Sequence, residues 1–100
     1  MKLPTDCKNM ADIRAEIDRV DAGLMAALAE RARYIDRAAQ IKTDIGLPAR
    51  IPDRVEEVVT NVGRLAVENG LPPEVYQKMW RDLIDWSIAR EEQFLGRDQT

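Results

Sequence analysis

The sequence predicts an all-α fold of three helices, one long and N-terminal and two shorter, in a single domain of residues 1–100. The run from about residue 10 to residue 44 contains no proline, and its apolar residues recur every three or four positions, which is the period of an amphipathic helix. Prolines stand at two later places where helices can begin, and no segment alternates apolar and polar residues as a strand would. An all-helical chain follows from these observations.

Residues 10–44 place an apolar row along one side of the expected helix, and this row is longer than one small domain can cover. Such a helix spans about 50 Å, whereas a compact domain of this length has a radius of gyration of about 13 Å. A second copy of the chain is the usual cover for such a row, so we expect an intertwined homodimer. The apolar positions of the row are Ile13, Ile17, Val20, Leu24, Leu28, Ile35 and Ala38.

The other boundaries follow from capping residues, prolines and a glycine. Asn9 can accept a hydrogen bond from the first turn of the long helix. Pro52 suits the first turn of a second helix because its missing N–H would be unpaired there, and Asn69-Gly70 is a common helix stop. Pro72-Pro73 opens the third helix in the same way. The polar segment at the start, residues 1–9, is expected to form an extended arm.

The composition argues against several classes of function. The net charge is −3, so a general affinity for nucleic acid or for an anionic membrane surface is not expected. The chain has no histidine and one cysteine, Cys7, which excludes an intramolecular disulfide and Cys/His zinc spacing. No apolar run approaches the roughly 20 residues that span a bilayer, and the first residues lack a signal-peptide core. We therefore expect a cytoplasmic protein with no metal and no cofactor.

Polar side chains interrupt the inner rows of all three expected helices. Arg31 and Lys42 are separated by about three full turns, so they point in nearly the same direction roughly 16 Å apart. In the third helix, Ser87 and Glu91 lie one turn apart on the inner face. Arg54 stands in the first turn of the second helix, where the backbone favours an anion. Together these groups can line a positively charged cavity for an anionic guest.

Each of these residues also has a structural interpretation. Arg31 and Lys42 can extend their charged ends to solvent, and Glu91 can neutralise Lys42 in the core. Interruptions spread over three helices make this interpretation weaker for the set than for any one residue. Arg14 lies about 100° from Arg31 around the helix, so it cannot serve the same pocket within its own helix. Across a two-fold dimer, Arg14 can reach the pocket of the partner.

The spacing of these residues resembles that of the all-helical chorismate mutases over about residues 4–96. The opening of the chain resembles most the isochorismate-pyruvate lyase branch of that family. The matching positions are Ala11-Asp12-Ile13-Arg14, Ile17-Asp18, Asp21, Leu28, Arg31, Ile41-Lys42 and Asp53-Arg54, with Pro4, Asp6, Cys7 and Met10 for the lyase branch.

The resemblance implies an intertwined homodimer with two equivalent active sites for chorismate or isochorismate, which are both dicarboxylates. Arg14 matches an arginine that enters the partner's site, and Arg31 matches one that binds a substrate carboxylate. Lys42 matches the lysine placed at the ether oxygen, and Arg54 matches a further arginine that contacts the substrate. The site would thus be built from both chains.

Three further positions bear on the reaction that the resemblance implies. Ser87 falls where mutases often carry a serine. Val55 stands where mutases commonly have a glutamate that contacts the ring hydroxyl of the substrate, and in this respect the chain resembles the lyase branch. Glu91 falls where many members carry a glutamine directed at the ether oxygen. Since a carboxyl group can donate a hydrogen bond only when it is protonated, we expect activity to fall as pH rises.

The function implied is a pericyclic one that needs no nucleophile and no metal. It is either a chorismate mutase that converts chorismate to prephenate by Claisen rearrangement, or an isochorismate-pyruvate lyase that gives salicylate and pyruvate, or both. The alternative from another class is a non-catalytic helical dimerisation module. For such a module, Arg31→Ala or Lys42→Ala would stabilise the fold by removing unmatched charge.

Overall fold

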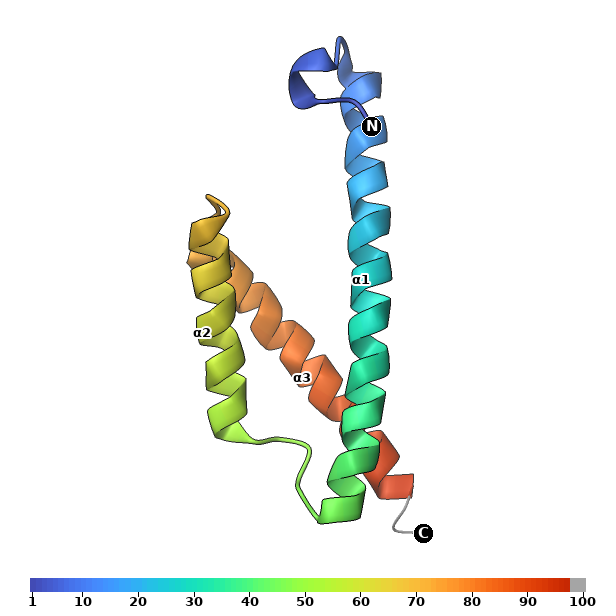
Figure 1. Ribbon diagram of the computed structural model, residues 1–100, viewed down its shortest axis with the longest axis vertical. Helices are drawn as coiled ribbons and strands as arrows, with labels where there is room; N and C mark the ends of the chain where they lie inside the picture. The colour runs from blue at the N-terminus through green and yellow to red at the C-terminus, as the bar shows by residue number, and fades with distance from the viewer. Residues whose placement is uncertain (98–100) are drawn as a thin grey trace. The chain divides into compact units, whose positions relative to one another are not determined.

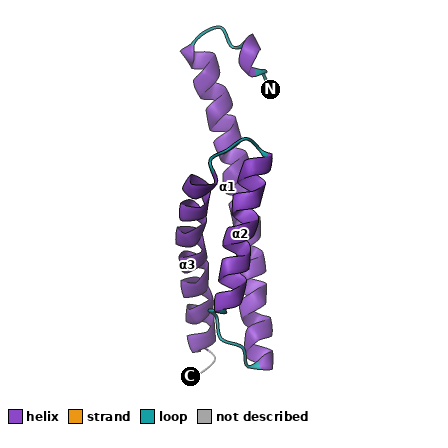
Figure 2. Cartoon of the chain, turned by 90° about the vertical axis from the view of Figure 1, so that its left-hand side faces the viewer, coloured by secondary structure: helices purple, strands orange, loops and turns teal. Residues whose placement is uncertain are grey.

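The computed structural model describes residues 1–97, with side chains described as far as Phe94. The chain runs through a short 3-10 helix η1 (Pro4–Asp6) and the helices α1 (Met10–Ile45), α2 (Pro52–Glu68) and α3 (Pro73–Arg97), as Figures 1 and 2 show. No strand occurs within this range, so the predicted all-α class is confirmed. The chain divides into two compact units, Met1–Arg33 and a second that begins at Tyr34, and each is described by itself.

The first unit begins with a capped helix start. The Asn9 side-chain oxygen accepts a hydrogen bond of 2.9 Å from the Asp12 backbone N–H, and the Asp12 carboxylate accepts one of 3.0 Å from the Lys8 backbone N–H. Asn9 thereby pairs a backbone donor that the first helical turn would leave unpaired, and Asp12 pairs the N–H of a residue just before the helix. The predicted cap at Asn9 is confirmed.

The segment expected to be an extended arm, residues 1–9, instead turns back along the start of α1. Pro4 opens the 3-10 turn of η1. The Lys2 backbone N–H then donates a 3.0 Å hydrogen bond to Glu16, and the Lys2 ammonium lies 3.2 Å from the Asp12 carboxylate. Acidic side chains in the first turns of α1 thus bind Lys2. Local residue preferences do not predict this contact, because it joins residues that are distant in the sequence.

The hydrogen bonds around Asp12 predict an acid-sensitive helix start. The Lys8 backbone N–H, and then the Lys2 side chain, lower the pKa of Asp12 from its ordinary value of 3.8. A lowered pKa means that the ionised carboxylate stabilises the folded state fully above about pH 4 and loses this effect as pH falls through the folded value. We expect Asp12→Asn to lower the thermal unfolding midpoint at pH 7, and the difference from wild type to shrink below pH 4. A difference that persists at pH 2.5 would contradict this assignment.

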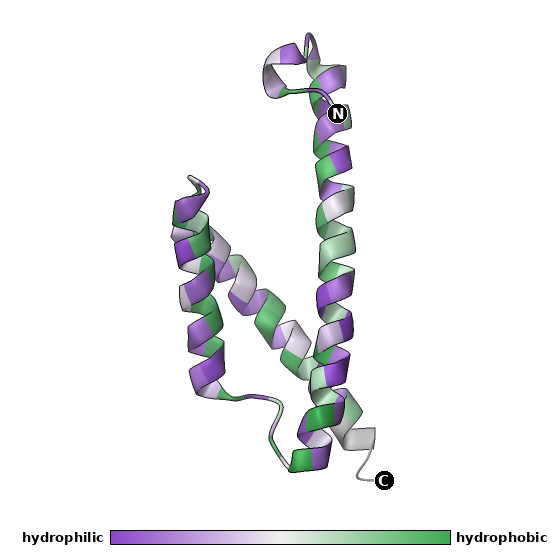
Figure 3. Cartoon of the chain, viewed as in Figure 1, coloured by the Kyte–Doolittle hydropathy of each residue, from purple (hydrophilic) through white to green (hydrophobic). Residues whose placement is uncertain are grey.

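The apolar row of the first unit is exposed. Ile17, Val20 and Leu24 are 52%, 47% and 57% exposed, and no residue of this unit is buried. Figure 3 shows the apolar residues recurring along α1 between polar ones. A row of large apolar side chains that stays in solvent is typical of a surface that another protein covers.

In the second unit, α2 and α3 form a helical hairpin (Figures 1 and 2). A small apolar core lies in this unit. Pro52 occupies the first position of α2, as predicted, and Gly70 ends the hairpin turn with φ of +72°, a conformation that favours glycine. The Leu71 and Gly70 N–H groups bind the Ala66 and Val67 carbonyls, which closes the end of α2. The core consists of Ala49, Val59, Ile84 and Ile88, with Val55, Val58 and Trp80 packed against it.

Candidate active site

Lys42 stands in the last turns of α1, and the way this helix ends determines what the lysine meets. Gly46 takes φ of +73°, and the Leu47 N–H binds the Lys42 carbonyl at 2.9 Å. This glycine-dependent cap turns the chain back on the helix. The loop that follows carries the buried Ala49 to the lysine, whose ammonium donates a 2.7 Å hydrogen bond to the Ala49 carbonyl.

The same ammonium is paired with the carboxylate of Glu91 from α3. The Lys42 Nζ and Glu91 Oε2 atoms lie 2.7 Å apart, and the two side chains are only 18% and 5% exposed. In such a setting the attraction between two charges is much stronger than in water, and each ion compensates the other's loss of hydration. The structure therefore holds one cation at a fixed place where three segments of the second unit meet.

Ser87 lies one turn before Glu91 on α3, and both are buried, as their position on the inner row predicts. The Ser87 hydroxyl donates a 2.8 Å hydrogen bond to the Leu83 carbonyl of its own helix. A serine that binds back to the helix in this way satisfies its donor without another helix. Ser87 and Glu91 thus supply the polar part of a wall whose neighbours, Ile84 and Ile88, are apolar.

Arg54 and Val55 occupy the first turn of α2 and differ in their surroundings. Arg54 is exposed and pairs with Glu57 one turn later. Val55 is half-buried and packs against the apolar cluster that includes Ala49, the residue whose carbonyl binds Lys42. An uncharged side chain therefore stands close to the segment that holds the lysine.

Arg14 and Arg31 belong to the first unit and are described with it. Arg14 is exposed, whereas Arg31 is half-buried and has an interaction within the protein. The structure thus brings together Lys42, Glu91 and the Ala49 carbonyl. The carbonyl is the partner that the sequence did not indicate, and its only signal was the glycine at position 46.

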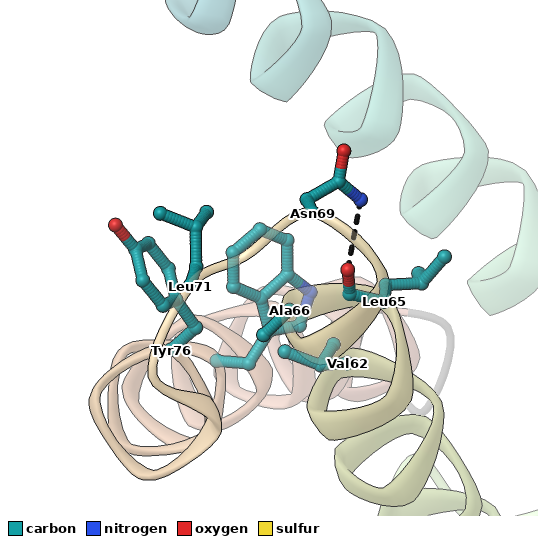
Figure 4. A pocket seen from close by; sticks show the side chains of 7 residues that line it. Val62, Leu65, Ala66, Asn69, Leu71 and Tyr76 are labelled. Carbon is teal, nitrogen blue, oxygen red and sulfur yellow. Dashed lines mark hydrogen bonds between the residues drawn. The ribbon is translucent and has the colours of Figure 1, made fainter.

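A hollow lies at the closed end of the α2–α3 hairpin (Figure 4). It has a volume of about 170 Å³. The Asn69 amide, one of its polar groups, donates a 2.8 Å hydrogen bond to the Leu65 carbonyl. Figure 4 marks this bond with a dashed line. A dicarboxylate is bound best by cationic groups on its oxygens, and no lining residue of this hollow is charged. The lining residues are Val62, Leu65, Ala66, Asn69, Leu71, Tyr76 and Trp80.

Comparison with known proteins shows where this arrangement belongs. Residues 13–92 match the family model described as chorismate mutase type II. The chain is a member of that family. The resemblance inferred from the spacing of the arginines and Lys42 is thereby confirmed.

Three known proteins are similar to most of this chain. The chain is 37% identical over 92 residues to the isochorismate pyruvate lyase of Pseudomonas aeruginosa, which covers 91% of this chain and 89% of that protein. It is 27% identical over 92 residues to the chorismate mutase of Methanocaldococcus jannaschii, with 92% and 93% covered. It also matches 24% of the bifunctional chorismate mutase/prephenate dehydratase of Aquifex aeolicus, at 30% identity over 88 residues.

The described part of the chain contains neither a candidate membrane span nor a candidate metal site. None of its helices combines the length and the apolar character that crossing a bilayer requires. Among the same residues, no three histidine, cysteine or acidic side chains gather in a way that could hold a metal ion.

Proposed function

We propose that the protein is a pericyclic enzyme that converts chorismate to prephenate and, as a second activity, isochorismate to salicylate and pyruvate. The observation that carries this proposal is the Lys42 ammonium, held between the Ala49 carbonyl and the Glu91 carboxylate in a member of the chorismate mutase type II family. An ammonium has three N–H donors, and these two acceptors take two of them. The third can point at a substrate oxygen.

Both reactions break an ether C–O bond, and negative charge develops on its oxygen as the bond lengthens. A fixed Lys42 ammonium stabilises that charge more in the transition state than in the ground state. The substrate is a dicarboxylate, so we assign Arg31 and Arg54 to its carboxylates. Holding both ends of the substrate selects its folded, reactive conformer and removes an entropic part of the barrier.

The proposal includes a homodimer in which Arg14 of one chain completes the site of the other. The exposed row of Ile17, Val20 and Leu24 supports a second copy as the cover, since a two-fold axis can place the same apolar row of both chains face to face. Arg14 is exposed on the same unit and is available to a partner. A cytoplasmic location, with no membrane or nucleic-acid partner, is part of the same proposal.

The second activity rests on separate observations. The relative at 37% identity is an isochorismate pyruvate lyase, and Val55 supplies an apolar side chain where mutases commonly place a carboxylate. Ser87, buried beside Glu91, is the residue that mutases often carry. The site thus combines features of both branches, which supports turnover of both substrates.

The activity is tested by incubating the purified protein separately with chorismate and with isochorismate. Prephenate from the first, and equal amounts of salicylate and pyruvate from the second, are the expected products, identified by chromatography and mass spectrometry. Turnover of only one substrate would assign the protein to one branch. Turnover of neither, by a protein that forms a stable dimer, would favour the helical dimerisation module.

The role of Glu91 predicts a pH dependence. The Glu91 carboxylate accepts a hydrogen bond from the Lys42 ammonium, and only a protonated Glu91 could also donate one to the substrate's ether oxygen. If this donor contributes to the chemical step, kcat/KM falls as pH rises. Glu91→Gln carries an amide that donates at every pH, and its profile should be flatter over the same range. Identical profiles for the two proteins, measured between pH 5 and 9, would remove Glu91 from the chemical step.

A further inference from the structure

Two adjacent residues of α3 bind α1 through ion pairs of opposite polarity, and both pairs lie within the second unit. Glu91 binds Lys42, as described above. Its neighbour Arg90 binds Asp36 with both arms of its guanidinium: Nε lies 2.6 Å from Oδ1, and Nη2 lies 3.0 Å from Oδ2. Such a bidentate contact fixes the orientation of the guanidinium and the carboxylate relative to each other, which a single hydrogen bond does not.

The two pairs lie on either side of a buried residue of α1. Ala39, which is fully buried, lies one turn after Asp36 and one turn before Lys42. At about 100° per residue, Asp36 and Lys42 stand some 60° to either side of Ala39 around the helix. Since both contact α3, the buried Ala39 lies between these two contacts on the side of α1 that is turned toward α3.

The order of the charges makes this arrangement specific for one alignment of the helices. Along α1 an acid is followed by a base, and along α3 a base is followed by an acid. A rotation or slide of α3 that brought Arg90 toward Lys42, or Glu91 toward Asp36, would place like charges together. The Arg90 guanidinium also makes a cation–π contact within its own helix. It lies 5.4 Å from the centre of the ring of Trp86, one turn earlier.

The Asp36–Arg90 pair is too exposed to contribute much to the stability of the folded protein. The two side chains are 40% and 43% exposed, and ion pairs at this exposure contribute little to the free energy of unfolding. The Arg90 hydrogen bonds lower the pKa of Asp36, so the pair stays ionised throughout the neutral range. The pair can instead control the position of α3 on α1. Displacements of about 1 Å at a reacting group can change rates by up to about 100-fold.

We propose that Asp36 and Arg90 are positioning residues that set the alignment of α3 on α1 and thereby hold the Glu91 carboxylate on the Lys42 ammonium. This inference rests on the proposed function only for its effect on turnover. Its structural part, the dependence of the Lys42–Glu91 contact on the neighbouring pair, stands independently.

The matched control is a second bidentate pair, between Arg81 of α3 and Glu56 of α2. Its Nη1–Oε1 and Nη2–Oε2 distances are 3.2 and 3.1 Å. It has similar exposure and links helices of the same unit, but it does not touch α1. Asp36→Asn and Arg90→Gln, singly and together, are compared with Glu56→Gln and Arg81→Gln. Thermal unfolding confirms that each variant is folded.

The first readout is independent of activity. The Lys42 ammonium and the Glu91 carboxyl group are followed by NMR on selectively labelled protein, through the ammonium signal and the carboxyl titration. We expect Asp36→Asn and Arg90→Gln to shift both signals, and the control variants to leave them unchanged. Unchanged signals in the Asp36 and Arg90 variants would overturn the proposal, whether or not the protein turns over either substrate.

The second readout is turnover, and it applies once the wild-type protein shows activity. Each single variant is expected to lower kcat by about tenfold while KM changes less than about twofold, because the pair acts on the placement of the reacting groups and not on the substrate's carboxylates. The double variant should lose no more than either single variant, since both remove the same contact. Losses that multiply, or equal losses in the Arg81 and Glu56 controls, would contradict a positioning role.

Discussion

Replacing Lys42 with methionine is expected to lower kcat/KM by about 10²–10³-fold, because one fixed donor at a developing negative charge is worth about that factor. Methionine keeps most of the length and apolar stem of lysine but has no charge and no N–H donor. The fall should appear mainly in kcat, since the contact strengthens as the ether bond breaks. The measurement is steady-state kinetics on chorismate and on isochorismate at one pH.

A loss of activity through unfolding must be separated from a loss of chemistry. Removing the cation alone leaves the buried Glu91 carboxylate uncompensated, which can cost about 3–5 kcal/mol of stability. Lys42→Met combined with Glu91→Gln removes both charges, so we expect it to unfold near the wild-type temperature and remain inactive. Lys78→Met, on the exposed face of α3, is the control with unchanged turnover. A Lys42→Met protein with wild-type kcat would refute the proposed mechanism.

The Lys42–Glu91 pair also changes what the dimerisation-module hypothesis predicts. That hypothesis expected Lys42→Ala to stabilise the fold by removing an unmatched charge. The lysine is matched by Glu91 and by the Ala49 carbonyl, so its removal is expected to destabilise the protein under either hypothesis. Turnover, and not stability, is therefore the property that distinguishes an enzyme from a module.

Mixing two inactive variants is expected to restore activity if each site draws Arg14 from one chain and Lys42 from the other. Arg14→Ala and Lys42→Ala are each inactive as homodimers under the proposed function. In a mixed dimer, one site receives both substitutions and the other receives neither. After equal amounts of the two are unfolded and refolded together, half of the dimers are mixed, and activity should reach about a quarter of the wild-type value.

The same experiment has an outcome for each alternative. No recovery on mixing, with mixed dimers present by native mass spectrometry, would mean that Arg14 serves the site of its own chain or none. Arg19→Ala is the control, because Arg19 is an exposed arginine of the same helix that binds Glu16 within its own chain. It should be active without mixing. A chain that stays monomeric at micromolar concentration would contradict the dimer itself.

Much of the fold could be predicted from local patterns. The cap at Asn9, the proline that opens α2 and the stop at Gly70 act over a few residues, through backbone groups that need a partner or a backbone angle that only glycine adopts easily. The three-and-four spacing of apolar residues likewise determines which face of each helix is turned inward. Ser87 and Glu91 were placed on an inner face by this rule, and both are buried.

Contacts between distant segments were not predictable in this way. The turn of residues 1–9 back onto Glu16 depends on which side chains of α1 lie near Lys2 in the folded chain. The Asp36–Arg90 pair joins residues 54 positions apart, and nothing in the local sequence of either helix selects the other as partner. The Ala49 carbonyl is available to Lys42 because Gly46 reverses the chain, which places a backbone oxygen where no side-chain pattern could indicate it.

The amino-acid sequence thus specified the helices, their inner faces and the family to which their charged residues belong, because periodicity and capping are properties of neighbours along the chain. The three-dimensional arrangement specified which charges meet. Whether Lys42 extends to solvent or is held as a fixed cation depends on the alignment of α3 against the end of α1. We assign that alignment to the two ion pairs on either side of the buried Ala39, interactions that exist only after the helices have come together.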